Sequence, residues 1–201
     1  MGSKQLCVLS VLACALSIPG VTLATDLSVN GQIQPHGACN IAVGNGGVID
    51  LGGLSFEKLV NWRPSDISLT INCQRLTKVA VKAIDNRKAS DAYVGAFGLS
   101  NPAIGYYEIY PALNYGSEAN GKEVYLIHDF GDAWGRSDMS WPRDRSISWG
   151  VPPSQEPRHW EPLAFKTLNT SLRIVVHFRN DIAFNDVQEF DGSATLELVY
   201  L

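Results

Sequence analysis

The sequence predicts an all-β domain, either a sandwich or a barrel. Short segments in which apolar and polar residues alternate recur along the chain, which is the pattern of strands with one buried face. Glycine, proline and asparagine lie between these segments, where tight turns are expected. No window shows helical periodicity for longer than a turn or two, and residues 56–62 are the best candidate for a short helix.

The first 24 residues have the layout of a cleavable secretory signal peptide. Lys4 supplies a positive charge, residues 6–21 are mostly apolar, and the segment ends at Ala24. A membrane anchor is the alternative, but Pro19 and Gly20 interrupt the apolar run and no charged cluster follows it. We therefore expect a secreted chain that begins at residue 25 or 26.

The cysteines depend on that cleavage. Residues 11–14 also resemble the site at which bacterial lipoproteins are acylated, which would be Cys14, although the motif fits poorly. Removal of the signal peptide would leave only Cys39 and Cys73 in an oxidising compartment. We therefore expect one disulfide between them, and two free buried thiols are the alternative.

Size and charge limit the classes of function. About 177 residues remain after cleavage, enough for one domain with a proper core. Only Lys4 is lost from the 16 basic residues, so 20 acidic residues outnumber the basic ones. This balance does not favour binding to nucleic acid or to an anionic membrane surface.

The strands follow in order along the chain. Residues 67–73 and 78–84 alternate well and are predicted to pair as a hairpin. Residues 106–110 and 124–127 are predicted to form a second hairpin, whose turn contains Asn120-Gly121. The last two strands cover residues 172–179 and 194–201, and the apolar positions of the final strand are Ala194, Leu196, Leu198 and Tyr200.

Residues 133–162 depart from this pattern. They contain five prolines, which argue against central strands, and the four tryptophans Trp134, Trp141, Trp149 and Trp160. Such a segment either packs over the sandwich or forms a ligand-binding loop. We expect packing, because large aromatic side chains are mostly buried.

The segment after the signal peptide carries the most specific pattern. One face holds Leu27, Val29, Gly31 and Ile33, and polar residues occupy the other face. Pro35 and Gly37 then separate this strand from Cys39. An ordinary first strand of the domain would explain the alternation, but not the glycine, which weakens a strand unless a close contact requires it.

At this point the chain resembles the chaperone–usher pilin family. In that family an N-terminal extension alternates apolar residues with one glycine, a cysteine follows and bonds to the next core strand, and the chain ends on a strand with a penultimate aromatic residue. Residues 27–33, Cys39 with Cys73, and Tyr200 stand in those places. The ending of the chain is closer to a branch of uncharacterised fimbrial-like proteins than to the common shaft subunits.

The resemblance implies an immunoglobulin-like β-sandwich that lacks its last strand. Residues 25–37 would be the donor-strand extension with its hinge, and residues 38–201 the single domain, with residues 133–162 as an insertion. The extension would complete a neighbouring fimbrial subunit, after a periplasmic chaperone had held the chain and an outer-membrane usher had received it. The protein would thus reach the cell surface of a Gram-negative bacterium as a fimbrial subunit that contributes to adhesion.

Two other classes of function are compatible with a secreted β domain. No G-x-S-x-G, H-E-x-x-H or C-x-x-C motif occurs, and the four histidines are far apart, so we expect neither an enzyme nor a metal or cofactor site. A carbohydrate-binding domain or adhesin is the stronger alternative, because tryptophans beside Asp, Asn and Arg suit a host or surface glycan. The presence of an N-terminal strand in a single domain favours an internal or minor subunit over a tip adhesin.

Overall fold

The computed structural model of the chain describes residues 38–53, 64–87, 95–111, 116–136, 140–154, 159–179 and 187–201. They belong to one compact unit, Gln34–Leu201. The predicted signal peptide, the alternating segment 27–33 and the helix candidate 56–62 lie outside the described residues. Within the described part of the chain, no helix is long and apolar enough to cross a membrane.

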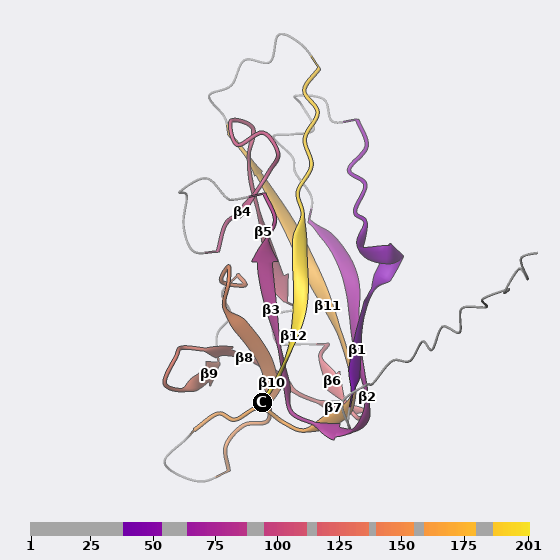
Figure 1. Cartoon of the computed structure of the whole chain (residues 1–201), viewed down its shortest axis with the longest axis vertical. Coiled ribbons are helices and arrows are strands. Elements are labelled where there is room, and N and C mark those ends of the chain that lie inside the picture. Colours follow the sequence, from indigo (N-terminus) through magenta and orange to yellow (C-terminus); the bar gives the residue numbers. More distant parts are fainter. Residues whose placement is uncertain are drawn as a thin grey trace, which may run out of the picture. The chain divides into compact units, whose positions relative to one another are not determined.

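The first of two antiparallel sheets is built around β11, its longest strand (Figure 1). β11 pairs with β2 on one side and β5 on the other, which gives the order β1-β2-β11-β5-β4. β6 also pairs with β11, and β7 with β6. The strands are β1 (Cys39–Val43), β2 (Ser65–Thr77), β4 (Phe97–Gly98), β5 (Gly105–Pro111), β6 (Glu118–Ala119), β7 (Lys122–Glu123) and β11 (Phe165–Phe178).

The second sheet has the order β12-β3-β10-β8-β9, and its pairs are also antiparallel. Its strands are β3 (Val79–Asp85), β8 (Tyr125–Asp129), β9 (Trp134–Arg136), β10 (Ser146–Gly150) and β12 (Ala194–Tyr200). The remaining element is a four-residue 3-10 turn, η1 (Gly44–Gly47), in which Asn45, Gly46 and Gly47 have positive φ.

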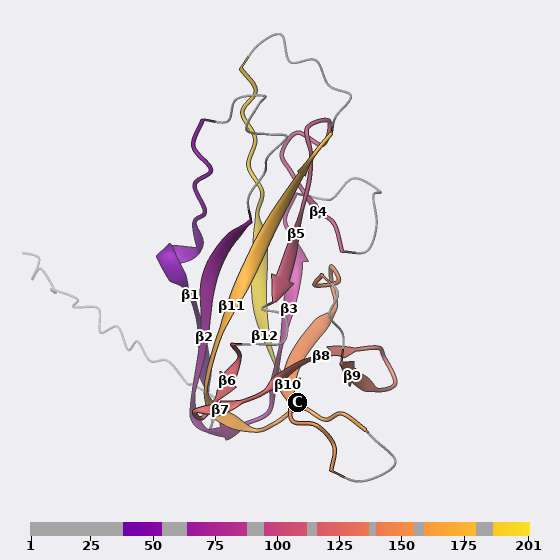
Figure 2. The same ribbon diagram turned by 180° about the vertical axis from the view of Figure 1, so that it is seen from behind.

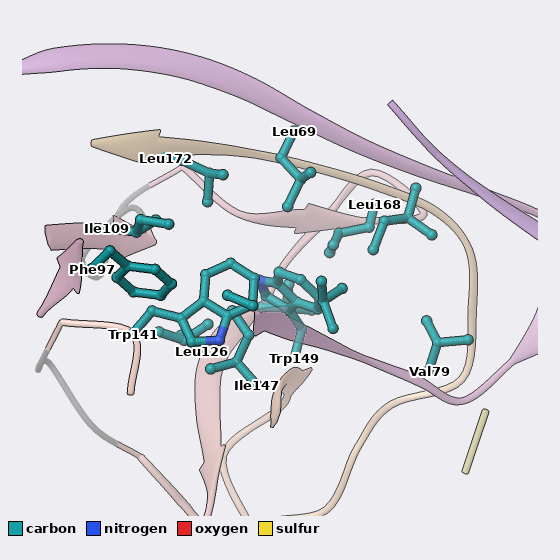
Figure 3. Packing of buried hydrophobic residues seen from close by; sticks show 14 of the residues in the cluster. Leu69, Val79, Phe97, Ile109, Leu126, Trp141, Ile147, Trp149, Leu168 and Leu172 are labelled. Atoms are coloured by element: carbon teal, nitrogen blue, oxygen red, sulfur yellow. The ribbon is translucent and has the colours of Figure 1, made fainter. Parts of the chain in front are cut away.

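The core lies between the two sheets. Figure 3 shows Leu69, Leu168 and Leu172 of the first sheet on one side of the core and Leu126, Ile147 and Trp149 of the second sheet on the other. These side chains are at most 7% exposed. Their positions follow the period-two alternation, because successive side chains of a strand point to opposite faces. The predicted all-β fold is confirmed, and of the two forms considered it is the sandwich.

The predicted hairpin between residues 67–73 and 78–84 is wrong. Only Lys78 separates β2 from β3, yet the two strands lie in different sheets. β2 pairs with β1 and β11, whereas β3 pairs with β10 and β12. Alternation shows only that each strand buries one face. Two strands of one hairpin do so, and so do two strands that lie in opposite sheets, as β2 and β3 do on either side of Lys78.

The second predicted hairpin is also wrong in its strands, although its turn is correct. Asn120 and Gly121 have φ values of 52° and 74° and connect β6 to β7, the short hairpin beside β11. β5 and β8, which the prediction paired, lie in different sheets. The Asn-Gly signal is local, so it identified the nearest hairpin and not the more distant strands.

The exclusion of central strands from residues 133–162 is wrong as well. β10 occupies the middle of the second sheet, between β3 and β8. Pro142 precedes it and Pro152 follows it, so the prolines flank β10 without removing any of its backbone donors.

Candidate functional site

β1 and β12 are terminal strands of the two sheets and meet on the same side of the sandwich. Among the described strands, β1 pairs only with β2, and β12 only with β3. The backbone N–H of Cys39, at the start of β1, donates a hydrogen bond of 2.9 Å to Tyr200 Oη, at the end of β12. We call the side of the molecule bounded by these strands the β1/β12 edge (Figures 1 and 2).

The apolar interior reaches the β1/β12 edge without being fully covered there. Leu198 pairs with Val81 and Leu196 with Ala83, so the members of each pair share one face of the sheet. Val81 and Ala83 are completely buried, whereas Leu196 and Leu198 keep intermediate exposure. A further strand along the β1/β12 edge would cover the exposed parts of the Leu196 and Leu198 side chains.

β1 repeats this arrangement in the other sheet. Ile41 and Val43 pack against the core cluster but are only partly buried, and Asn40 and Ala42, which alternate with them, are exposed. Sequence reasoning did not include Ile41 and Val43 in the site. The alternation of residues 39–43 could have identified them, but it is only five residues long.

A disulfide fixes the start of this edge. Cys39 and Cys73 face each other directly in the β1–β2 ladder and are bonded, with a Cα–Cα distance of 3.9 Å. The expected bridge is therefore present. The bridge joins the first residue of β1, which follows residues 25–38 in the sequence, covalently to β2.

The predicted residues of the last strand all lie on β12. Ala194, Leu196 and Leu198 pack against the core cluster, and Tyr200, at the end of the strand, is 48% exposed. The predicted donor-strand residues Leu27, Val29, Gly31 and Ile33 lie outside the described residues.

The four tryptophans do not form one ligand-binding loop. Trp141 and Trp149 are completely buried in the core (Figure 3). The Trp149 ring packs edge-on against Phe165, with 6.4 Å between the ring centroids. For these two residues the expected packing is confirmed and the alternative of a ligand-binding loop is wrong, because their rings fill the space between the sheets. Trp134 and Trp160 are partly exposed and are joined by a β-bridge.

The two exposed tryptophans belong to a small aromatic cluster on the second sheet. Tyr125 packs edge-on against Trp160 at 6.0 Å, and the guanidinium of Arg136 lies 4.9 Å from the centre of the Tyr125 ring. Sequence reasoning missed Tyr125 and Arg136, because β8 and β9 bring them to Trp160 only in the folded chain.

A polar cluster lies on β5 and β11, away from the β1/β12 edge. Glu108 is buried and accepts a 2.9 Å hydrogen bond from Tyr110 Oη, and its other oxygen is hydrogen-bonded to His177 Nε2. Burial and the bond to Glu108 raise the pKa of Tyr110. The cluster links neighbouring strands but supplies no activated nucleophile, and among the described residues no group of acidic, His or Cys side chains could hold a metal ion.

One buried histidine stands apart from these groups. His128 on β8 is 2% exposed, and its Nε2 has no hydrogen-bond partner. Burial lowers the pKa of His128 to about 4, so the ring is neutral near pH 7.

Comparisons with known proteins find similarity to a protein family and to solved structures. Residues 27–120 match a family model described as protein of unknown function (DUF1120). The match begins at the alternating segment 27–33 and extends through β6. The crystal structure of the P pilus rod subunit PapA is similar with a TM-score of 0.44 and 14% sequence identity, over 80% of this chain and 99% of that one. No curated protein matches the sequence.

Proposed function

We propose that the chain is a structural subunit of a chaperone–usher fimbria and polymerises by donor-strand exchange. The observation that carries the proposal is the β1/β12 edge, where two terminal strands leave Ile41, Val43, Leu196 and Leu198 partly exposed. Exposed strand edges beside apolar surface invite pairing with another chain. An added strand would form main-chain hydrogen bonds and place alternate side chains over these residues.

The segment 27–33 has the properties that such a strand needs. Its alternating apolar side chains match a surface that accepts every second residue. Its seven residues would span roughly 23 Å when extended, and β12 also has seven residues. The segment could therefore lie along the whole of β12 in a neighbouring copy.

The proposed partners follow from this role. A periplasmic fimbrial chaperone would cover the β1/β12 edge first, and the segment 27–33 of the next subunit would replace it at the outer-membrane usher. The assembled fimbrium would lie on the surface of a Gram-negative bacterium and contribute to adhesion. The role is structural and requires neither catalysis nor a cofactor.

Expression in the periplasm with and without a fimbrial chaperone tests the proposal. We expect a much higher yield of soluble chain when the chaperone is present, in a one-to-one complex, because the chaperone strand covers the exposed edge. A chain that is equally soluble, monomeric and heat-stable without the chaperone would contradict the incomplete fold. It would indicate that the edge is covered within the chain.

Glycan binding is a second candidate function, favoured by the partly exposed aromatic cluster of Tyr125, Trp134 and Trp160. Aromatic rings can stack on sugar rings, and an arginine beside them can donate hydrogen bonds to the sugar hydroxyl groups. Screening the chaperone-bound chain on a glycan array, with Trp160→Ala as the matched variant, tests this role. Binding that persists unchanged in the variant would locate the glycan elsewhere.

A further inference from the structure

Several large apolar side chains are exposed to solvent at one end of the sandwich. Among the described residues, seven large apolar side chains are conspicuously exposed, and four of these lie at this end. They are Leu76 (60% exposed), Val151 (48%), Tyr200 (48%) and Leu201 (54%). Single exposed apolar residues are ordinary, but a group of them marks an interaction surface.

The strand registers place these four residues together. Tyr200 pairs with Val79, and the N–H of Leu201 donates to the carbonyl oxygen of Lys78 at 3.1 Å. Leu76 lies two residues before Lys78, at the end of β2. β10 runs antiparallel to β3, so Val151, just after β10, lies at the end where β3 begins. We call this group of four residues the apolar pole.

Charged side chains border the apolar pole. Lys78 and Glu161 form an ion pair of 3.7 Å at this end of the sandwich, and their side chains are 46% and 75% exposed. An apolar centre with a charged rim is the usual composition of a surface that docks on another protein.

The short link between the segment 27–33 and Ala38 indicates which molecule docks on the apolar pole. The hydrogen bond from Cys39 to Tyr200 shows that β1 begins at the apolar pole, and Ala38, the described residue before it, lies at the same end. The four residues 34–37 separate the segment 27–33 from Ala38, and five extended steps from Ile33 to Ala38 span at most about 18 Å. A subunit that holds the segment 27–33 must therefore lie close to this pole.

On the basis of the proposed function, we infer that the apolar pole is a second contact between neighbouring subunits. It docks on the same subunit whose β1/β12 edge receives the segment 27–33 of this chain. The short connection brings the two sandwiches together, and burial of the apolar pole then stabilises the joint in addition to the donor strand.

Paired lysine variants test this inference. Leu76→Lys with Val151→Lys alters the apolar pole, and Val48→Lys with Val187→Lys is the matched control. Val48 and Val187 are 61% and 92% exposed, and they lie after β1 and before β12, away from the apolar pole. All four positions are exposed, so thermal melting of each chaperone-bound chain should remain close to that of the wild type.

Two measurements separate the inference from the proposed function. The first is uptake of a synthetic peptide of residues 26–34 by each chaperone-bound chain, which requires only the β1/β12 edge. The second is the rate at which two full chains form a joint. We expect the Leu76/Val151 variant to take up the peptide normally but to form joints about tenfold more slowly, because two apolar contacts are lost.

The other outcomes are equally informative. Joint formation at the wild-type rate in the Leu76/Val151 variant would overturn the second contact and leave donor-strand exchange intact. An equal decrease in the control variant would overturn it too, since the effect would then come from added charge. A wild-type chain that takes up no peptide and forms no joint would overturn the proposed function, and the inference with it.

Discussion

The backbone N–H of Cys39 donates a 2.9 Å hydrogen bond to the Tyr200 hydroxyl, across 161 positions of sequence. The bond joins the first residue of β1 to the last residue of β12, and therefore links the terminal strands of the two sheets. Cys39 is also bonded to Cys73, so one end of the β1/β12 edge is held by a disulfide and by a hydrogen bond.

Tyr200→Phe should lower the free energy of unfolding slightly. The substitution removes the acceptor of the Cys39 N–H and keeps the ring, and a neutral hydrogen bond contributes about 0.5–1.5 kcal/mol. The half-exposed site favours the lower end of this range. Denaturant unfolding of the purified chain measures the change. Tyr125→Phe on β8 is the control, and an equal loss there would contradict a specific role for the Tyr200 hydroxyl.

Replacement of both Cys39 and Cys73 by alanine should destabilise the chain by about 3–4 kcal/mol, because the 34-residue separation closes a loop that constrains the unfolded chain. The expected result is a lower melting temperature that no longer responds to dithiothreitol. The wild type under dithiothreitol should approach the variant. A wild-type melting temperature that dithiothreitol does not change would show that the bridge contributes little to stability.

Leu196→Ala and Leu168→Ala should differ although the substitution is the same. Leu168 is completely buried, and its truncation should cost the 2–5 kcal/mol that is typical of a core leucine. Leu196 is partly exposed, so its truncation should cost less in the chain without a donor strand. Thermal melting with and without the peptide of residues 26–34 measures both effects.

Binding of the peptide of residues 26–34 should affect the two leucine variants differently. When it is bound, the cost of Leu196→Ala should rise, because a donor strand would complete the burial of Leu196. The cost of Leu168→Ala should not change. If the peptide leaves both costs unchanged, it does not bind over Leu196.

The sequence predicts the strands well and their pairing poorly. Alternation predicts a strand over residues 194–201, and β12 occupies Ala194–Tyr200. The pattern arises because one face of the strand packs on the core and the other does not. β2 and β3 were predicted correctly as strands and wrongly as a hairpin. A strand buries one face in the same way in either sheet, so alternation does not identify the sheet.

The candidate site shows the same division. The disulfide and the residues of β12 could be predicted, since two cysteines remain after cleavage and β12 alternates over seven residues. The sequence does not show which of the four tryptophans are buried, because residues 133–162 have no clear periodicity. Trp141 and Trp149 therefore could not be distinguished from the partly exposed tryptophans. Tyr125 and Trp160 meet only through the fold of β8 and its neighbours.

His128 should make the chain less stable as the pH falls from 6.5 to about 4. Burial lowers the pKa of the folded state to about 4, whereas the unfolded chain binds a proton near the ordinary value of 6.5. The unfolded state therefore binds more protons in this range, and stability is lost as the pH decreases, by at most about 3 kcal/mol. Below about 4 this contribution is constant.

Denaturant unfolding at several pH values measures that slope. His128→Leu should reduce the slope between pH 4 and 6.5, and His159→Leu, at an exposed position, should not. The hydrogen bond from Arg173 lowers the pKa of Asp66, so the effect of Asp66 on stability changes mainly at pH values below the range from 4 to 6.5. An unchanged slope in His128→Leu would assign the pH dependence to other groups.

Gly31→Leu should block assembly while sparing the chaperone-bound chain. Gly31 is the one position on the apolar face of the segment 27–33 without a side chain, and a neighbour that receives this strand would approach its backbone most closely there. Insertion of a leucine into a formed core typically costs about 1–3 kcal/mol, so every joint of the polymer would be weakened. Sedimentation of the assembled chains measures the loss.

Asn30→Leu is the matched control, because it adds a leucine to the polar face of the same segment. We expect it to assemble normally, since that face would point away from the receiving sandwich. If instead the segment 27–33 completes its own chain, Gly31→Leu should lower the melting temperature of the chaperone-free monomer first. Normal multimers from Gly31→Leu would contradict donor-strand exchange, because the strand would then meet no close contact at its only glycine.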